Sequence, residues 1–91
     1  MKLRERRYSG VDGTLKFSMN FTINGTSRAL ELPAAPTLDK LIAALELKGD
    51  RIAVEHNGSI VQRTQWPATL VAEGDRLEIV HFVGGGAPWA L

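Results

Sequence analysis

Apolar and polar residues alternate from Met19 to Ile23, so every second side chain points to the same face. This period of two predicts a half-buried β-strand. The dipeptide Asn24-Gly25 follows at once, and both of its residues readily adopt the positive φ angles of a type I′ turn. A further stretch, roughly residues 27–32, places its leucines on one face. We therefore predict a β-hairpin at the start of the regular part of the chain.

The period then changes to that of an α-helix. Pro33 and Pro36 end the second strand, and Thr37 is a suitable N-cap residue. Gly49 is expected to end the helix in the left-handed conformation. One helical face is formed by apolar residues at the required spacing, namely Leu38, Leu41, Ile42 and Leu45.

Three further strands are predicted after the helix, over residues 51–56, 60–61 and 76–83. Asn57-Gly58 is a second turn of the hairpin type. Residues between the last two strands lack a regular pattern, and Trp66 among them is expected to fill the bottom of the core. A single amphipathic helix must bury its apolar stripe against a sheet. The pattern therefore predicts an α+β domain with one helix packed on one face of the sheet.

The two ends of the chain lack such patterns. Residues 1–18 mix charges with Ser-Gly and Asp-Gly pairs, and we expect them to form a flexible leader, with Met19 as the original start of the protein. Residues 84–91, Gly-Gly-Gly-Ala-Pro-Trp-Ala-Leu, are expected to form a flexible tail, because glycine loses the most backbone freedom on ordering. The folded domain is then expected to span residues 19–83.

Composition narrows the classes of function. Ninety-one residues suit one domain, and the absence of cysteine excludes disulfides, thiolate metal sites and thiol nucleophiles. The net charge is only +1, and the basic excess lies in the first 18 residues, so we expect no nucleic-acid partner. No apolar run approaches the roughly 20 residues of a membrane span, and no signal peptide is recognisable. We expect a cytoplasmic protein without a membrane partner.

Conventional active-site motifs are missing, so we expect a protein that is not itself an enzyme. His56 and His81 lack the spacing of metal ligands, and we expect ordinary structural or surface roles for both, with no metal and no bound cofactor. The strongest candidate feature is Gly84-Gly85-Gly86. A mobile segment without side chains can enter a narrow channel on another protein, where a Cβ atom would collide with the walls.

From Met19 to Gly86 the chain resembles the ThiS family, the sulfur carrier proteins of thiamin biosynthesis, which have the ubiquitin-like β-grasp fold. The resemblance rests on local matches that occur in the family's order. They are Asn24-Gly25, Thr37-Leu38-Asp39-Lys40-Leu41-Ile42, Ile52-Ala53-Val54-Glu55-His56-Asn57-Gly58-Ser59-Ile60-Val61, Arg63-Thr64-Gln65-Trp66, Glu73-Gly74-Asp75-Arg76-Leu77-Glu78-Ile79-Val80 and His81-Phe82-Val83-Gly84-Gly85-Gly86. It implies a β-grasp domain with a mixed sheet of four to five strands.

The resemblance also implies a chemistry at Gly86, with Gly84 and Gly85 as its flexible arm. An E1-like adenylating enzyme would use ATP to activate the terminal carboxylate, and a persulfide protein would donate sulfur. The resulting thiocarboxylate would serve thiazole synthase. This chain departs from the family because Ala87-Pro88-Trp89-Ala90-Leu91 follows Gly86. We expect a precursor that a peptidase cuts after Gly86.

Other functions stay open. Within the same fold, the small subunit of molybdopterin synthase uses the same glycine thiocarboxylate, and further sulfur-carrier pathways exist. An alternative of another class is a β-grasp interaction module whose tail has no function. For any of these, the residues next to the tail are the expected docking site for a partner. We expect Arg63, Phe82 and Val83 to contribute to it, because Phe82 alternates with Leu77 and Ile79 and so faces away from them.

Overall fold

The structure is a computed structural model that describes residues 6–8 and 15–82. Its first large element is the hairpin of β2 (Leu15–Ile23) and β3 (Thr26–Leu32). The two strands pair in antiparallel register from Phe17↔Leu32 to Ile23↔Thr26. Asn24 and Gly25 between them have φ angles of 50° and 81°. The predicted hairpin and its turn are therefore confirmed.

The helix α1 (Leu38–Ala44) begins after Thr37, as predicted, although the Thr37 hydroxyl makes no capping bond to the helix backbone. The helix ends earlier than expected. Glu46, with φ 61°, adopts the left-handed conformation that the sequence analysis assigned to Gly49, so that assignment was wrong. Gly49 instead begins a short 3₁₀ turn, η1 (Gly49–Arg51), and a Cβ atom there would lie 2.7 Å from Cζ3 of Trp66. Glycine is needed at this position for space.

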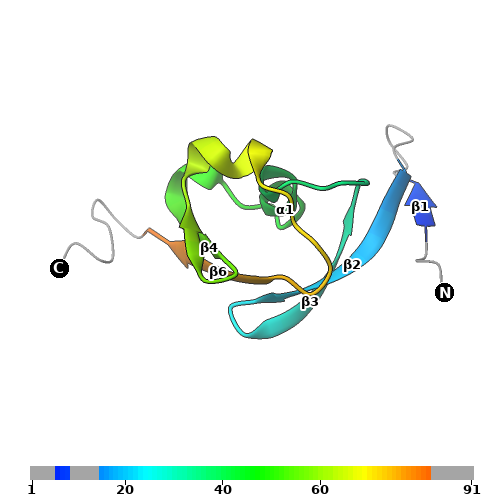
Figure 1. Cartoon of the computed structure of the whole chain (residues 1–91), viewed down its shortest axis with the longest axis horizontal. Coiled ribbons are helices and arrows are strands. Elements are labelled where there is room, and N and C mark those ends of the chain that lie inside the picture. Colours follow the sequence, from blue (N-terminus) through cyan, green and yellow to red (C-terminus); the bar gives the residue numbers. More distant parts are fainter. Residues whose placement is uncertain (1–5, 9–14, 83–91) are drawn as a thin grey trace.

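Four further elements follow in the described part of the chain: β4 (Ile52–His56), β5 (Ser59–Val61), the 3₁₀ helix η2 (Arg63–Ala68) and β6 (Arg76–His81). The last strand lies in the middle of the sheet. It pairs in parallel with β2 and antiparallel with β4, which also pairs with β5. Helix α1 and η2 contact each other and lie on the same side of the curved sheet (Figure 1). The predicted α+β architecture, a mixed sheet with one helix on one face, is confirmed.

The sheet begins earlier than the sequence analysis expected. Strand β1 (Arg6–Tyr8) pairs with β2 at Leu15, Lys16 and Phe17, which adds a sixth strand. Residues 6–8 and 15–18 thus belong to strands and not to a flexible leader, and the rest of the predicted leader lies outside the described residues. The physical reason is visible in the sequence, because the alternation that includes Met19 already starts with Leu15 and Phe17. Strand β3 pairs with Phe17 and Ser18, and β1 pairs with Leu15, Lys16 and Phe17.

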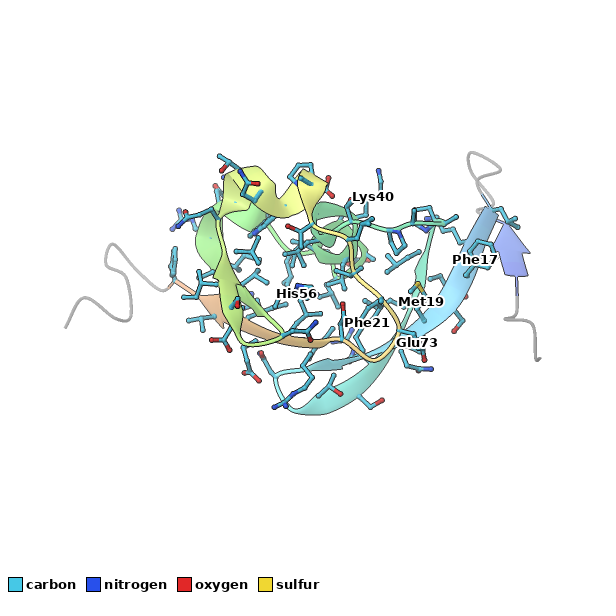
Figure 2. All side chains as sticks on the ribbon, viewed as in Figure 1. Phe17, Met19, Phe21, Lys40, His56 and Glu73 are labelled. Carbon is cyan, nitrogen blue, oxygen red and sulfur yellow. The ribbon has the colours of Figure 1, made fainter. Side chains whose placement is uncertain are left out.

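One hydrophobic core lies between the sheet and the helical side. In Figure 2, Phe21 and Met19 extend from β2 toward this interior, and Glu73 lies beside β2, where it accepts a hydrogen bond from the Asn20 backbone amide at 2.9 Å. Trp66 is 4% exposed, which confirms its predicted place in the core. The buried apolar residues are Phe21, Ile23, Leu30, Leu32, Leu38, Leu41, Ile42, Ile52, Val54, Trp66, Val71, Leu77 and Ile79.

In the part of the chain that the structure describes, no helix has both the length and the apolar character that crossing a membrane requires.

Candidate functional site

The predicted site residues at the C-terminal end, Val83, Gly84, Gly85 and Gly86, lie outside the described residues. The structure describes the residues that precede them in the sequence, at the end of β6. The Phe82 backbone amide donates a hydrogen bond to the Arg51 carbonyl oxygen at 2.8 Å. The last described residue is therefore still attached to the neighbouring chain segment that leads into β4.

The side chains of β6 alternate between the two faces of the sheet. Leu77 and Ile79 are buried in the core, whereas Val80 is 45% exposed and Phe82 is half-buried. Val80 and Phe82 share the parity that points away from α1. Phe82 therefore lies on the face opposite to Leu77 and Ile79, as the alternation of the sequence indicates.

Phe82 lines a concavity of about 510 Å³ beside the end of β6. Arg63, which comes from η2, lines the same concavity, so the structure brings together two of the three predicted docking residues. We call this surface the apolar concavity. Its walls include the side chains of Ala53, Ile60, Arg63, Trp66, Val80 and Phe82. Most of these walls are hydrocarbon, which suits an apolar group of a partner protein.

Sequence reasoning missed two residues of this surface, Ile60 and Val80. Ile60 is 72% exposed, the most among the large hydrophobic side chains that the structure describes as exposed. It pairs with Glu55 on the outer face of β4. The sequence could have indicated Val80, because it is two positions from Phe82 and so points to the same face of the sheet. For Ile60, the strand was predicted but not the face to which each of its residues points.

A charged band borders the apolar concavity on the same outer face. Glu55 is paired with Glu78 on β6 and with Ile60 on β5, so the two carboxylates are direct cross-strand neighbours. Like charges in this position repel each other. Together with Arg76 and Asn57 they line a second hollow of about 550 Å³. The outer face is therefore apolar near the end of β6 and mainly acidic farther back.

His56 and Asp75 hold the turn that precedes β6. Nε2 of His56 lies 2.7 Å from Oδ2 of Asp75, and the Ala72 backbone amide donates to the same oxygen at 2.9 Å. Burial acts to raise the pKa of Asp75, but hydrogen bonds from His56, Ala72 and Asn57 outweigh it, so the pKa lies below its ordinary value of 3.8. The pair fixes the end of β4 to this turn, which is a structural role. His81 is exposed at the end of β6.

Two turn asparagines contact the backbone of β6. Oδ1 of Asn57 accepts a hydrogen bond from the Arg76 amide at 2.8 Å. Oδ1 of Asn24 accepts one from the Ile79 amide at 2.7 Å, and Nδ2 of Asn24 donates to the Ile79 carbonyl oxygen at 3.1 Å. The sequence pattern identifies both asparagines as turn residues only. It does not reveal these contacts, because Asn24 and Ile79 are 55 positions apart.

The donor set for a metal is limited. Among the residues described, no three His, Asp or Glu side chains gather in a way that could hold an ion. Near the end of β6, the feature that stands out among the described residues is the apolar concavity.

Comparison with known proteins gives concordant results. The model of the ThiS family matches residues 17–86. The crystal structure of the thiamine biosynthesis protein ThiS from Geobacter metallireducens superposes with a TM-score of 0.64 at 33% identity, and the match covers 75% of this chain and 100% of that one. The β-grasp fold is thereby confirmed. The sulfur carrier protein ThiS of Bacillus subtilis is 36% identical over 50 residues, which are 55% of this chain and 76% of that protein.

Two longer proteins are also similar. The thiazole synthase of Magnetococcus marinus is 37% identical over 68 residues, and that of Paramagnetospirillum magneticum is 38% identical over 72 residues. These matches cover 75% and 79% of this chain but only 20% and 22% of the two synthases. The chain thus spans about a fifth of the length of the thiazole synthases that it matches.

Proposed function

The chain belongs to the ThiS family of sulfur carrier proteins, and we propose that Gly86 is the residue that is adenylated and converted to a thiocarboxylate for thiazole formation. The observation that supports this most directly is the extent of the family match, which runs through the domain and ends at Gly86. The chain has no cysteine and cannot hold sulfur as a persulfide of its own. A terminal carboxyl group is then the remaining site at which the chain could carry sulfur.

The proposed chemistry has three steps. A carboxylate oxygen of Gly86 attacks the α-phosphorus of ATP, and pyrophosphate leaves, which forms an acyl-adenylate. The terminal sulfur of a protein persulfide then attacks the carbonyl carbon, and AMP leaves, because a mixed anhydride is a far better electrophile than a carboxylate. A second thiol cleaves the resulting acyl disulfide at its S–S bond. The products are the thiocarboxylate and an ordinary disulfide.

The sequence places a peptide bond where this chemistry needs a carboxylate, because Ala87 follows Gly86. We propose that a peptidase hydrolyses the Gly86–Ala87 bond before activation. Pro88 then lies two positions beyond the cleaved bond and keeps the removed segment from continuing a strand. Until that cleavage, the chain is inert toward ATP.

The adenylating enzyme is proposed to dock on the apolar concavity. Phe82 and Arg63 line it, and Val83, the third predicted docking residue, follows Phe82 in the sequence. Docking there holds the domain beside the segment that must enter the active site, which raises the effective concentration of the carboxylate. The acidic pair Glu55 and Glu78 next to the concavity favours a partner that presents basic side chains at this edge.

Thiazole synthase is proposed as the acceptor of the sulfur. The supporting observation is that similar segments occur within two thiazole synthases. The chain itself is proposed to act as a carrier, with ATP bound by the adenylating enzyme and the sulfur supplied by a persulfide protein. The family match favours this acceptor over molybdopterin synthase.

The test uses the chain that ends at Gly86, its adenylating enzyme, ATP and an assay for pyrophosphate. We expect pyrophosphate release with this chain and none with the chain that continues to Leu91. A third variant that ends at Val83 controls for release that does not depend on the glycines. Equal release from all three would contradict the proposal and favour an interaction module. Transfer of the sulfur to a molybdopterin synthase large subunit, but not to thiazole synthase, would identify the other pathway.

A further inference from the structure

Asn24 contacts β6 at the point where the backbone pairing of β6 with β2 ends. Backbone pairing of β6 with β2 is limited to Thr22↔Arg76 and Ile23↔Leu77. Beyond Leu77, β2 has ended and the chain turns into β3 at Asn24. On this side of β6, the next interaction that the structure describes is made by the side chain of Asn24.

The side-chain amide of Asn24 acts here like a peptide group of an additional strand residue. The backbone amide of Asn24 donates a hydrogen bond to the Leu77 carbonyl oxygen at 2.9 Å. The side chain of Asn24 then forms hydrogen bonds with both the amide and the carbonyl oxygen of Ile79. The ladder is thereby extended by one residue pair toward Phe82. On the other side of β6, the Phe82 amide bonds to Arg51. The end of β6 is held from both sides.

The turn alone does not require asparagine at this position. Glycine and aspartate also adopt the positive φ of a type I′ turn. Glycine has no side chain, and an ionised aspartate has no donor for the Ile79 carbonyl oxygen. Of these three turn residues, only asparagine supplies both a donor and an acceptor there. Asn57 has nearly the same φ, 49°, but its side chain meets the Arg76 amide alone among the backbone groups of β6.

We propose that Asn24 is a positioning residue for partner docking: its amide holds the last part of β6, so that Phe82, which precedes the glycines in the sequence, is held in one place. This inference rests on the proposed function. Ile79 is three positions before Phe82, so loosening the backbone of Ile79 increases the freedom of this docking residue. The docked complex must then order more of the chain, which weakens binding.

The first measurement is amide hydrogen exchange, which needs no partner protein. Asn24→Gly keeps the turn conformation and removes the side chain. We expect the Ile79 amide to exchange about five- to tenfold faster, which is the ratio expected for one lost hydrogen bond of ordinary strength. The Val71 amide, which donates to the Pro36 carbonyl oxygen and belongs to a core residue outside β6, serves as the reference for a general loss of stability and is expected to change less. Equal acceleration at both amides would overturn the proposal.

The second measurement is the adenylation rate of chains that end at Gly86. For Asn24→Gly and Asn24→Asp we expect the KM of the adenylating enzyme for the carrier to rise about five- to tenfold with kcat little changed, because uniform binding is lost. Ile42→Val, a mild core change on α1, serves as the control for lowered stability. An equal rise in KM with this control, or no rise with Asn24→Gly, would overturn the proposal.

The two measurements separate this inference from the proposed function. Absence of adenylation in the parent chain refutes the proposed function and, with it, a role of Asn24 in that reaction. Fast exchange at Ile79 together with an unchanged KM refutes only the positioning role. Fast exchange together with a raised KM supports both.

Discussion

Replacing Gly49 with alanine tests whether close packing against Trp66 dictates this glycine. A Cβ atom would lie 2.7 Å from Cζ3 and 3.4 Å from Cη2 of Trp66. The indole cannot move away easily, because it is 4% exposed and its N–H donates to the Val61 carbonyl oxygen at 3.1 Å. The φ angle of Gly49 is not in the positive region, so the backbone itself would accept alanine.

The magnitude follows from two opposing effects. Overpacking a tight site costs about 1–3 kcal/mol, and alanine recovers about 0.4–1 kcal/mol by restricting the unfolded chain. We expect Gly49→Ala to lower the free energy of unfolding by about 1–2 kcal/mol. For a domain of this size, each kcal/mol corresponds to a fall in Tm of about 4–8 °C.

Urea denaturation measures this loss, and a double-mutant cycle identifies its cause. In a Trp66→Leu background, Gly49→Ala should cost less, because the clashing ring is gone. Gly58→Ala is the matched control: Gly58 has a φ of 91° and open space around its Cβ position, so its cost comes from the backbone and should not depend on Trp66. A Gly49→Ala protein as stable as the parent, or costs that simply add in the double variant, would refute the packing argument.

Two further predictions concern pH and docking. Because the pKa of Asp75 is below 3.8 in the folded protein, its carboxylate contributes stability that is present above pH 3.8 and is lost as the pH falls through the folded-state pKa. The difference in urea midpoint between the parent and Asp75→Asn should therefore shrink in that acid range, and a difference that stays constant would contradict this. Ile60→Ser should raise the KM of the adenylating enzyme by about tenfold, as expected for an apolar contact residue. Leu70→Ser, which changes another exposed hydrophobic residue outside the apolar concavity, should leave this KM unchanged. Equal effects of the two substitutions would argue against docking on the apolar concavity.

Local turn chemistry was the part of the fold that the sequence predicted best. Asn24-Gly25 and Asn57-Gly58 both adopt positive φ angles, as their residue types require. The helix start at Thr37 was also predicted from a local residue preference, although the Thr37 hydroxyl makes no capping bond to the helix backbone.

The errors arose where a distant residue decides the local structure. Gly49 was assigned to the helix end, but its role is to make room for Trp66, which a local pattern does not show. The extension of β2 to Leu15 depends on pairing with β1, and β3 pairs with β2 only as far as Phe17. The alternation of apolar residues is compatible with this longer strand but does not show its partner.

The candidate site was predicted in part. The alternation along β6 placed Phe82 on the outer face, and the structure brings Arg63 beside it. Ile60 was missed because a three-residue strand is too short to show a period. The predicted roles of Gly84, Gly85 and Gly86 remain predictions, because these residues lie outside the described part of the chain.

The most direct test of the central claim is the intact mass of the chain that ends at Gly86, after incubation with its adenylating enzyme, ATP, a persulfide protein and a thiol. We predict a mass increase equal to the exchange of one oxygen for sulfur, located on the C-terminal peptide. An unchanged mass, in a reaction where the same enzymes thiolate another ThiS protein, would contradict the claim.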